Sequence, residues 1–323
     1  MLREHFPRGD ASLVLTENPG EADVILIGNP RPENDWAKLR ACEMVRRFPA
    51  KSFVLNDADE VPRYCQGIQT SLTRSVWNFG RFRSGSYFLF HPDFKNPHVE
   101  RWFENRRART VATPPAKEYL ASFSGRNCLP LRSRLLALPW KREDVFIRDT
   151  THSFDNFTHH PLGKGPAQEG YFNIAIRSRF LLCPRGNGAA SIRFFEAMQL
   201  GVAPVLISDD WVLPEGPDWS RCMLRVPEDQ LDRLEAILER NEARAAEIGA
   251  EAQRAYERFF HGEAYVRYLI AAACDIQRTR TAVPEAWFRF TWAPSLLAKK
   301  VGRRLHRATR KATRTAGVQP RTA

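Results

Sequence analysis

The sequence lacks three features that would place it in familiar classes of protein. It has no stretch of roughly 18 uncharged apolar residues, no cysteine pair at C-x-x-C spacing and no histidines spaced as metal ligands. The first absence predicts a chain that does not cross a membrane, and residues 1–20 also lack the apolar core of a signal peptide. The six scattered cysteines predict reduced thiols in a cytoplasmic protein, not a disulfide framework or a zinc site.

Excess charge is also scarce over most of the chain. The net charge is +12, but residues 278–323 hold twelve Lys or Arg and one acid, so residues 1–277 carry only +1. Apolar residues make up 43% and charged residues 27% of the 323 residues, which is typical of soluble globular proteins of about two domains. This composition excludes general disorder and a polytopic membrane protein.

Short β-rich apolar runs alternate with longer segments of helical period, which predicts an α/β architecture. Strands are expected at residues 23–27, 52–55, 87–90, 119–123, 145–147, 179–183 and 203–207. Helices are expected at residues 37–48, 99–103, 131–138, 171–177 and 189–200, and throughout 228–277. A loop is expected at residues 151–170.

Periodicity is lost at residues 108–118, where Pro114 and Pro115 stand together, and this predicts a domain boundary. The expected organisation is an α/β domain over 1–115, a second α/β domain over 116–277 and a helical, basic tail over 278–323.

Residues 180–219 carry the strongest pattern in the chain. An apolar strand is followed by a Gly-rich turn and then by a helix. Such a turn offers unpaired N–H groups and the positive end of the helix dipole to a phosphate. Arg185 adds a positive charge beside the turn. Glu196 shares a helix face with Arg193 and is available to a ligand hydroxyl, and Asp209 follows the next strand at the same edge of a parallel sheet.

One interpretation of these residues is a dinucleotide site. Gly186, Gly188 and Ser191, with Asp209 about twenty residues on, nearly match the G-x-G-x-x-G fingerprint and its ribose-binding acid. The third glycine is replaced by Ser191, and the motif does not open a domain. An NAD- or FAD-dependent oxidoreductase is therefore the rival interpretation.

The other interpretation rests on a family resemblance: residues 180–219 resemble the C-terminal signature of the exostosin family of glycosyltransferases. The shared features are a strand ending in Cys-Pro-x-Gly, then a Ser, an Arg, Glu-Ala and a Gly, and an apolar strand with Pro-Val before Ile-Ser-Asp. They stand at residues 183–186, Ser191, Arg193, Glu196-Ala197, Gly201, Pro204-Val205 and residues 207–209. Upstream, residues 123–125 with Arg132 resemble the start of the family's donor-binding domain, and residues 50–75 resemble it only weakly.

The resemblance implies a GT-B fold of two facing Rossmann-like domains and inverting transfer from a nucleotide sugar to a glycan or lipid-linked acceptor. Arg185 and the amides near residues 186–189 would then hold the diphosphate in place of a metal cofactor, and Glu196 would bind the ribose. Arg193 either pairs with Glu196 or reaches the phosphates. The implied donor site consists of Gly125, Arg126, Arg185, Gly186, Gly188, Ser191, Arg193, Glu196 and Asp209.

Inversion requires a general base from the first domain. Asp57 and Asp59 follow an expected strand and meet this requirement, while His91 and Asp93, after the next expected strand, are rivals. Each of the two preferred aspartates also has an ordinary interpretation as a turn or helix-cap residue. No metal is expected, because no Asp-x-Asp pair follows a strand in the second half.

The basic tail has an apolar stripe at helical spacing, formed by Leu297, Val301, Leu305, Ala308 and Ala312. Aromatic residues stand just upstream, so residues 284–323 are expected to bind an anionic membrane surface, with the protein cytoplasmic or peripheral on the inner membrane face. No nucleic-acid partner is expected. A disordered basic tail and a non-catalytic adaptor for membrane or nucleic acid are the alternatives.

Overall fold

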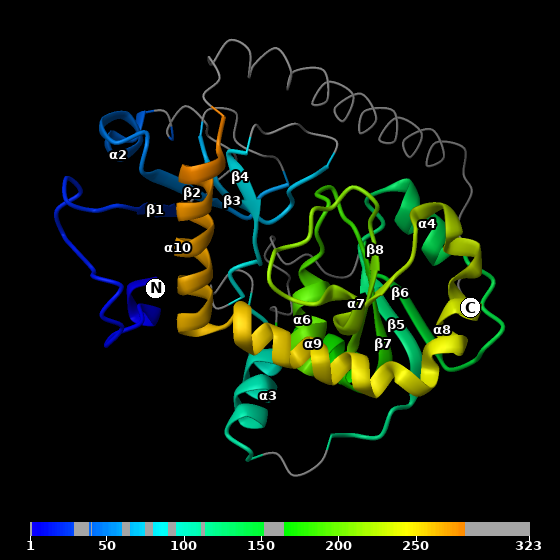
Figure 1. Cartoon of the computed structure of the whole chain (residues 1–323). Helices are drawn as coiled ribbons and strands as arrows, with labels where there is room; N and C mark the ends of the chain where they lie inside the picture. Colours follow the sequence, from blue (N-terminus) through cyan, green and yellow to red (C-terminus); the bar gives the residue numbers. More distant parts are fainter. Residues whose placement is uncertain are drawn as a thin grey trace.

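The computed structural model of the chain describes residues 2–28, 39, 41–59, 65–74, 80–89, 95–110, 114–151 and 165–281. These residues form two separate parallel sheets with helices packed around them (Figure 1). The predicted α/β class is confirmed. Across the described ranges, no helix combines the length and the apolar character needed to span a bilayer.

The first sheet has the strand order β1-β2-β3-β4, and all its neighbours are parallel. It follows the 3-10 helix η1, Leu2–His5, and the short helix α2, Glu43–Arg47, lies between its first two strands in sequence. The strands are β1, Ile25–Gly28; β2, Ser52–Asn56; β3, Gly67–Gln69; and β4, Phe82–Ser84.

The strand predicted at residues 87–90 is wrong over its described part, residues 87–89. The first sheet ends with β4. Tyr87 and Leu89 instead join a hydrophobic core that residues of both sheets share, where Tyr87 packs edge-to-face on Phe195. The apolar run is therefore buried by side-chain packing and not by strand pairing. The three-residue strands β3 and β4 were missed because they show no apolar alternation.

The second sheet has the order β6-β5-β7-β8-β9 and is also parallel throughout. Its strands are β5, Tyr119–Gly125; β6, Val145–Asp149; β7, Ser178–Pro184; β8, Ala203–Ile207; and the unpredicted β9, Leu224–Arg225. Successive residues of β7 alternate between two cores, with Phe180 and Leu182 on one face and Leu181 and Cys183 on the other. Burial on both faces explains its unbroken apolar sequence.

The helices of the second half follow the strands that they cover. They are α4, Pro130–Leu136; α5, Gly165–Ile176; α6, Ile192–Leu200; α7, Trp219–Cys222; η2, Glu228–Arg233; α8, Leu234–Asn241; η3, Glu242–Arg244; and α9, Ala245–Phe259. Helix α5 begins at Gly165, six residues before the predicted start at residue 171, so the expected loop is too long. Pro166 is compatible with this start because the first helical turn does not need its N–H.

Two helices cross between the halves. Helix α3, Pro97–Arg107, packs against α5 and α6, whereas α10, Gly262–Thr279, packs against β3 and β4 (Figure 1). Uninterrupted helix over residues 228–277 is therefore a wrong prediction, because the chain turns between α9 and α10 at Gly262, whose φ is +51°. The domain boundaries stay a prediction, since helix packing crosses the one at residue 115.

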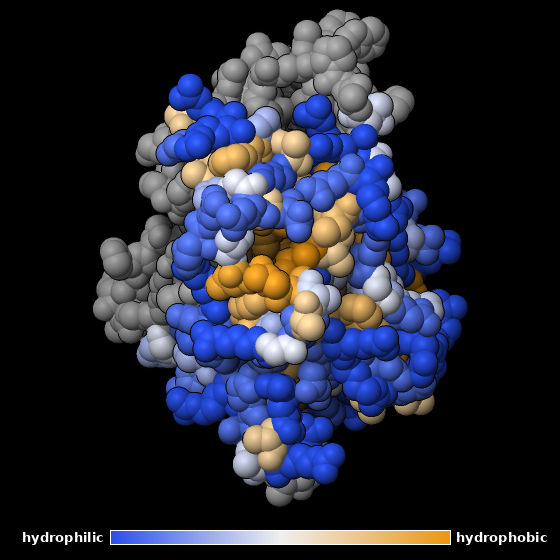
Figure 2. Space-filling model, turned by 60° about the vertical axis from the view of Figure 1, so that its left-hand side comes forward, coloured by the Kyte–Doolittle hydropathy of each residue, from blue (hydrophilic) through white to orange (hydrophobic). Residues whose placement is uncertain are grey.

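Helix α10 is tied to the first sheet by hydrogen bonds as well as by packing. Tyr265 donates to the carbonyl of Ser86 at 2.7 Å, Tyr268 donates to the carbonyl of Ser84 at 2.6 Å, and Arg83 pairs with Asp275 at 2.6 Å. On the side of the first sheet and the N-terminal segment, the surface is hollowed, with apolar residues inside a hydrophilic rim (Figure 2).

Candidate active site

The site centres on the turn that joins β7 to α6, at the carboxyl edge of the second sheet. Ser191 is the N-cap of α6, with φ −128° and ψ 130°, but its side chain makes no capping hydrogen bond. Its hydroxyl finds no hydrogen-bond partner in the described part of the protein, although the residue is only 3% exposed. A buried hydroxyl without a partner requires an explanation, and a ligand oxygen at the helix start supplies one.

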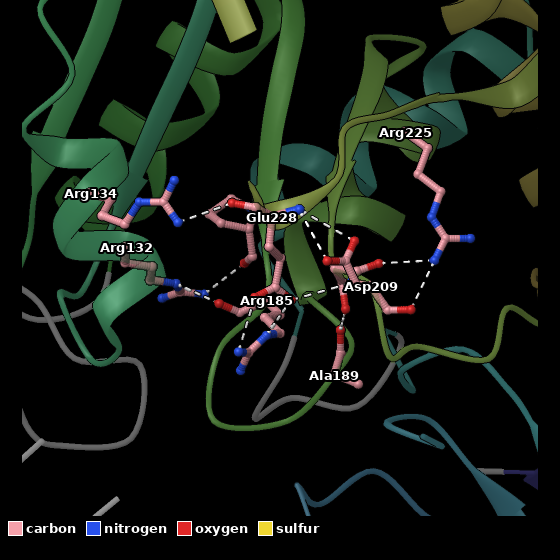
Figure 3. A network of polar contacts seen from close by, with 9 residues as sticks. Arg132, Arg134, Arg185, Ala189, Asp209, Arg225 and Glu228 are labelled. Atoms are coloured by element: carbon pink, nitrogen blue, oxygen red, sulfur yellow. Dashed lines mark hydrogen bonds and ion pairs between the residues drawn. The ribbon is translucent and has the colours of Figure 1, made fainter. Parts of the chain in front are cut away.

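Arg185 lies beside this turn, at the end of β7, in a network that Figure 3 shows from close by. Its Nε and Nη2 atoms donate to the two carboxylate oxygens of Glu228, at 2.6 and 3.1 Å. The Asp209 carboxylate accepts the backbone N–H of Glu228 at 3.2 Å, and Arg225 donates to the Asp209 carbonyl at 3.1 Å. The residues after β7 and β8 are thereby joined to the start of η2.

Arg132, in helix α4, contacts the same carboxyl edge of the second sheet. Its guanidinium is buried and donates to the carbonyls of Arg126, Pro184 and Arg185, at 3.0 to 3.1 Å. Burial, followed by the charge of Arg193, lowers the pKa of Arg132 to about 10, so it stays charged at neutral pH. The side chain of Arg126 is exposed at the surface of this edge.

Arg193 and Gly125 meet where β5 ends. Arg193 Nε donates to the carbonyl of Ser124 at 2.7 Å, and its guanidinium lies over the ring of Phe123. A Cβ on Gly125 would lie 2.6 Å from the Phe123 ring and 2.9 Å from Arg193 Nη2, so a larger residue here would displace both side chains. Gly186 is less crowded, because its Cβ would be 3.4 Å from the nearest atom, Nη2 of Arg132.

Glu196 faces the interior of the second half. It is 8% exposed and its Oε2 accepts the hydroxyl of Tyr171 at 2.8 Å. Burial raises the pKa of the Glu196 carboxyl, while the charge of Arg193 and the Tyr171 hydrogen bond oppose that rise. This burial excludes a solvent-exposed ion pair as the explanation of Glu196, and its role toward a ribose stays a prediction.

The first half brings Asp59 to the same place. Asp57 and Asp59 both follow β2, and a Cβ on Gly188 would lie 2.6 Å from Asp59 Oδ1 and 2.5 Å from Ser71 Oγ. Asp59 and Ser71 therefore approach the turn before α6 so closely that any side chain at residue 188 would displace them. The rival bases His91 and Asp93 lie outside the described residues.

Buried amides hold the loop that carries these aspartates. Asn56 Nδ2 donates to Gln69 Oε1, Gln69 Nε2 donates to the carbonyl of Ala58 at 2.7 Å, and the Asn56 amide oxygen accepts the N–H of Ala58. Asn56 and Gln69 are almost fully buried. The path of the chain from β2 to Asp59 is therefore set by a polar network and not by apolar packing.

A backbone connection also joins the halves beside the site. Thr73 and Trp211 form an antiparallel bridge, the N–H of Arg74 donates to the carbonyl of Asp210 at 2.8 Å, and Trp211 Nε1 donates to the carbonyl of Thr70 at 2.8 Å. Trp211 is completely buried. The loops after β3 and β8 are therefore held together across the two sheets.

Sequence reasoning missed Glu228, Ser71 and Gln69. Glu228 lies outside the motif at residues 180–219, and Ser71 and Gln69 lie in a region of weak resemblance, so no local pattern marked them. Among the described residues, no group of three His, Cys, Asp or Glu is placed to hold a metal ion, and metal independence stays a prediction. The tail over 284–323 lies outside the described residues.

Comparison with known proteins identifies the family. The model of the exostosin GT47 domain matches residues 63–241, which is more than half of the chain. This chain belongs to the exostosin GT47 family. The match confirms the resemblance inferred from residues 180–219 and extends it to residues 63–241 of this exostosin-family chain.

Curated relatives extend the match. "Exostosin-1c" of Danio rerio is 26% identical over 228 residues, covering 63% of this chain and 31% of the relative. "Exostosin-1 homolog" of Caenorhabditis elegans is 35% identical over 92 residues, covering 28% of this chain and 24% of the relative. "Probable glucuronosyltransferase GUT1" of Oryza sativa subsp. japonica is 37% identical over 87 residues, covering 26% of this chain and 19% of the relative. The matches thus span at most about a third of these proteins' own length.

Among solved structures, WaaG, described as a glycosyltransferase involved in lipopolysaccharide biosynthesis, aligns with 78% of this chain and 74% of its own. The TM-score is 0.32 and the sequence identity is 14%. Similarity at this level adds nothing to what the two sheets establish about the fold.

Proposed function

We propose that this exostosin-family chain is a glycosyltransferase that moves a sugar from a nucleotide-sugar donor to a hydroxyl group of a glycan or lipid-linked acceptor, with inversion at the anomeric carbon. Membership of the exostosin GT47 family supports the activity. The observation that carries the proposal is the start of α6, where the buried hydroxyl of Ser191 has no partner among the described residues.

The start of α6 is suited to a diphosphate. At the start of this nine-residue helix, the N–H of Phe194 donates to the Ser191 carbonyl at 3.1 Å, whereas the preceding amides of the first turn have no acceptor within the helix. The helix dipole adds partial positive charge there. The Ser191 hydroxyl and the neighbouring Arg185 supply further donors. Together these groups bind an anion whose oxygens accept several hydrogen bonds at once.

The same groups would stabilise the leaving group. In the proposed reaction, the acceptor oxygen forms a bond to the anomeric carbon while the bond from that carbon to the diphosphate breaks, so negative charge grows on the diphosphate. Donors that are already oriented stabilise such charge without reorganisation. Glu196, on the same helix, is proposed to accept hydrogen bonds from the ribose.

Asp59 is our preferred general base, and Asp57 remains the alternative. The contact of Asp59 with Gly188 supports this preference, because it places a carboxylate of the first half beside the donor-binding turn of the second. Asp59 would take the proton of the acceptor hydroxyl as that oxygen attacks. Asp59→Asn should abolish transfer and retain donor binding, whereas Asp57→Asn should lose much less activity.

Ser191→Ala tests the site directly. The hydroxyl has no partner to lose in the described structure, so we expect an unchanged melting temperature with at least about tenfold weaker binding of nucleoside diphosphates, since one hydrogen bond to a charged group contributes about 1.5 to 3 kcal/mol. Binding of UDP, GDP, ADP and CDP is measured by calorimetry.

Ser178→Ala is the matched control, because this buried hydroxyl bonds Ser122 at 2.7 Å and the carbonyl of Ile174 at 2.8 Å. It should lower the melting temperature and leave nucleotide binding unchanged. Equal nucleotide affinity of the Ser191→Ala variant and the parent would contradict the placement of the diphosphate.

Two simpler measurements separate the rival functions. Sugar-transfer activity that persists in EDTA supports stabilisation of the diphosphate without a metal. Activity that EDTA abolishes and manganese restores contradicts it. An oxidoreductase would instead change the absorbance of a reduced nicotinamide or flavin.

We further propose, from composition alone, that residues 284–323 bind anionic membranes. Their deletion should abolish binding to anionic vesicles and leave nucleotide binding intact. Replacing Leu297, Val301 and Leu305 with Ser keeps the charge, and unweakened vesicle binding by that variant would leave only a polycationic tail.

A further inference from the structure

The Arg185–Glu228 ion pair involves a residue, Glu228, that lies outside the sequence motif at residues 180–219. Both side chains are partly buried, with 30% of Arg185 and 21% of Glu228 exposed. The carboxylate takes Nε and Nη2 of the same guanidinium, so it occupies one edge of that planar group. Arginine has five N–H donors in a fixed plane, and the remaining three lie on the edges turned away from Glu228.

Glu228 is itself held from several sides. Its own N–H donates to the Asp209 carboxylate, its carboxylate accepts the N–H of Asp209 at 3.3 Å, and its carbonyl accepts Nη1 of Arg134 at 3.1 Å. Figure 3 shows these contacts converging on Glu228 at the carboxyl edge of the second sheet. The carboxylate is therefore a fixed point against which a long, flexible arginine side chain is oriented.

We propose that Glu228 is a positioning residue that holds Arg185 in the orientation required for the donor diphosphate. The inference rests on the proposed function, because it assumes that the turn before α6 binds that diphosphate. Orientation before binding matters, since an arginine side chain otherwise loses rotamer freedom when a ligand immobilises it. Glu228 does not touch the donor in this account and acts through Arg185.

The opposite effect is also physically possible and defines the test. A carboxylate beside an anion site repels the anion and competes for the same guanidinium, so removing its charge would then strengthen binding. Positioning predicts weaker binding in Glu228→Gln, and competition predicts tighter binding. Glutamine keeps the size of the side chain and an oxygen that accepts the N–H of Asp209.

The experiment measures calorimetric binding of UDP, GDP, ADP and CDP to four proteins: the parent, Glu228→Gln, Arg185→Ala and the double variant. We expect each single variant to bind about tenfold more weakly than the parent. The double variant should bind no more weakly than Arg185→Ala, because Glu228 has no effect once the side chain that it positions is gone.

A charge-exchanged variant separates positioning from stability. Arg185→Glu combined with Glu228→Arg restores an ion pair, so its melting temperature should recover toward that of the parent relative to either single charge reversal. Nucleotide binding should not recover, because the cation now projects from residue 228. Recovery of nucleotide affinity together with the melting temperature would show that the pair serves stability only.

The outcomes distinguish the two proposals. If the parent binds a nucleotide and Glu228→Gln binds it equally well or more tightly, the positioning role is overturned and the proposed function stands. A loss of affinity that is as large in the Arg185→Ala background as in the parent also overturns it. If the parent binds none of the four nucleotides, the proposed donor site fails, and the role of Glu228 fails with it.

Discussion

The two sheets of this exostosin-family protein differ in the polar side chains that they bury beside their apolar ones. In the second sheet, β7 and β8 place apolar residues on both faces, and polar contacts gather at the carboxyl edge. In the first sheet, the buried residues include Asn56, Gln66 and Gln69, which hydrogen-bond within the half. The difference teaches that specific amide pairs add to apolar packing in the first half, and such pairs tolerate fewer alternatives than apolar contacts do.

The largest expected effect comes from adding a side chain to Gly67, where two neighbouring strands of the first sheet lie close together. Gly67 has a φ of +153°, and a Cβ there would lie 2.0 Å from the carbonyl oxygen of Val54 on the neighbouring strand. Because backbone cannot yield as a side chain can, Gly67→Ala should cost more than about 4 kcal/mol or prevent folding. Chemical denaturation followed by circular dichroism measures the loss.

Gly170→Ala is its control in the second half. Gly170 lies within α5 and an added Cβ meets nothing within 4 Å, so alanine should stabilise by about 0.5 to 1 kcal/mol. A Gly67→Ala variant as stable as the parent would contradict the close strand approach.

The next largest effect tests the buried amides. Gln69→Leu removes a hydrogen-bond partner of Asn56 and of the Ala58 carbonyl, and each lost buried hydrogen bond costs about 1 to 3 kcal/mol, so a total of about 2 to 6 kcal/mol is expected. Transfer should fall because the loop to Asp59 loosens, while nucleotide binding in the second half is retained.

The control is Gln277→Leu, whose bond to the carbonyl of Asp23 is exposed and should cost less than about 0.5 kcal/mol. Denaturation, transfer and calorimetry on the same samples give all three results. Loss of nucleotide binding in Gln69→Leu would show that the halves do not act separately.

A smaller effect on stability and a large one on activity are expected where the halves meet. In Gly188→Ala the new Cβ would press on Asp59 and Ser71, two side chains that can move at a cost of about 1 kcal/mol. Under the proposal that Asp59 is the general base, displacing its carboxylate by about 1 Å should lower transfer by about 100-fold. Gly186→Ala, with its nearest atom at 3.4 Å, is the control for stability. Full transfer activity in Gly188→Ala would remove Asp59 from the reaction.

The smallest expected effect concerns Glu196, a buried acid of the second half. Burial raises its pKa above the value of 4.5 in an unfolded chain, so the folded protein binds this proton more tightly. That contribution to stability is present below pH 4.5 and is lost as pH rises through the raised pKa. The parent should therefore lose stability relative to Glu196→Gln as pH increases from 4.5 through the raised pKa.

Tyr171→Phe sharpens this test. It removes a hydrogen bond that lowers the pKa of Glu196, so the pH dependence should become steeper. Denaturation curves at several pH values measure the trend. A stability difference between parent and Glu196→Gln that does not change with pH would contradict burial of the carboxyl.

The two halves also differed in how well they could be predicted. In the second half, strands β5 to β8 and helices α4 and α6 agree with the sequence patterns, because burial on both sheet faces produces unbroken apolar runs between turn residues. In the first half, β3 and β4 were missed and a strand was wrongly expected at residues 87–90. Strands of three residues stabilised by Gln69 and by backbone partners leave no periodic signal.

The sequence by itself determined the α/β class, the Gly-containing turn between β7 and α6, and the family, since all three depend on residues close together in the chain. Only the tertiary structure decided that Arg185 meets Glu228, that Asp59 approaches Gly188 and that α10 returns to the first sheet. Local order reports burial and turn geometry, whereas a contact between residues tens to hundreds of positions apart depends on how whole elements pack. The catalytic arrangement proposed here is made of such distant contacts.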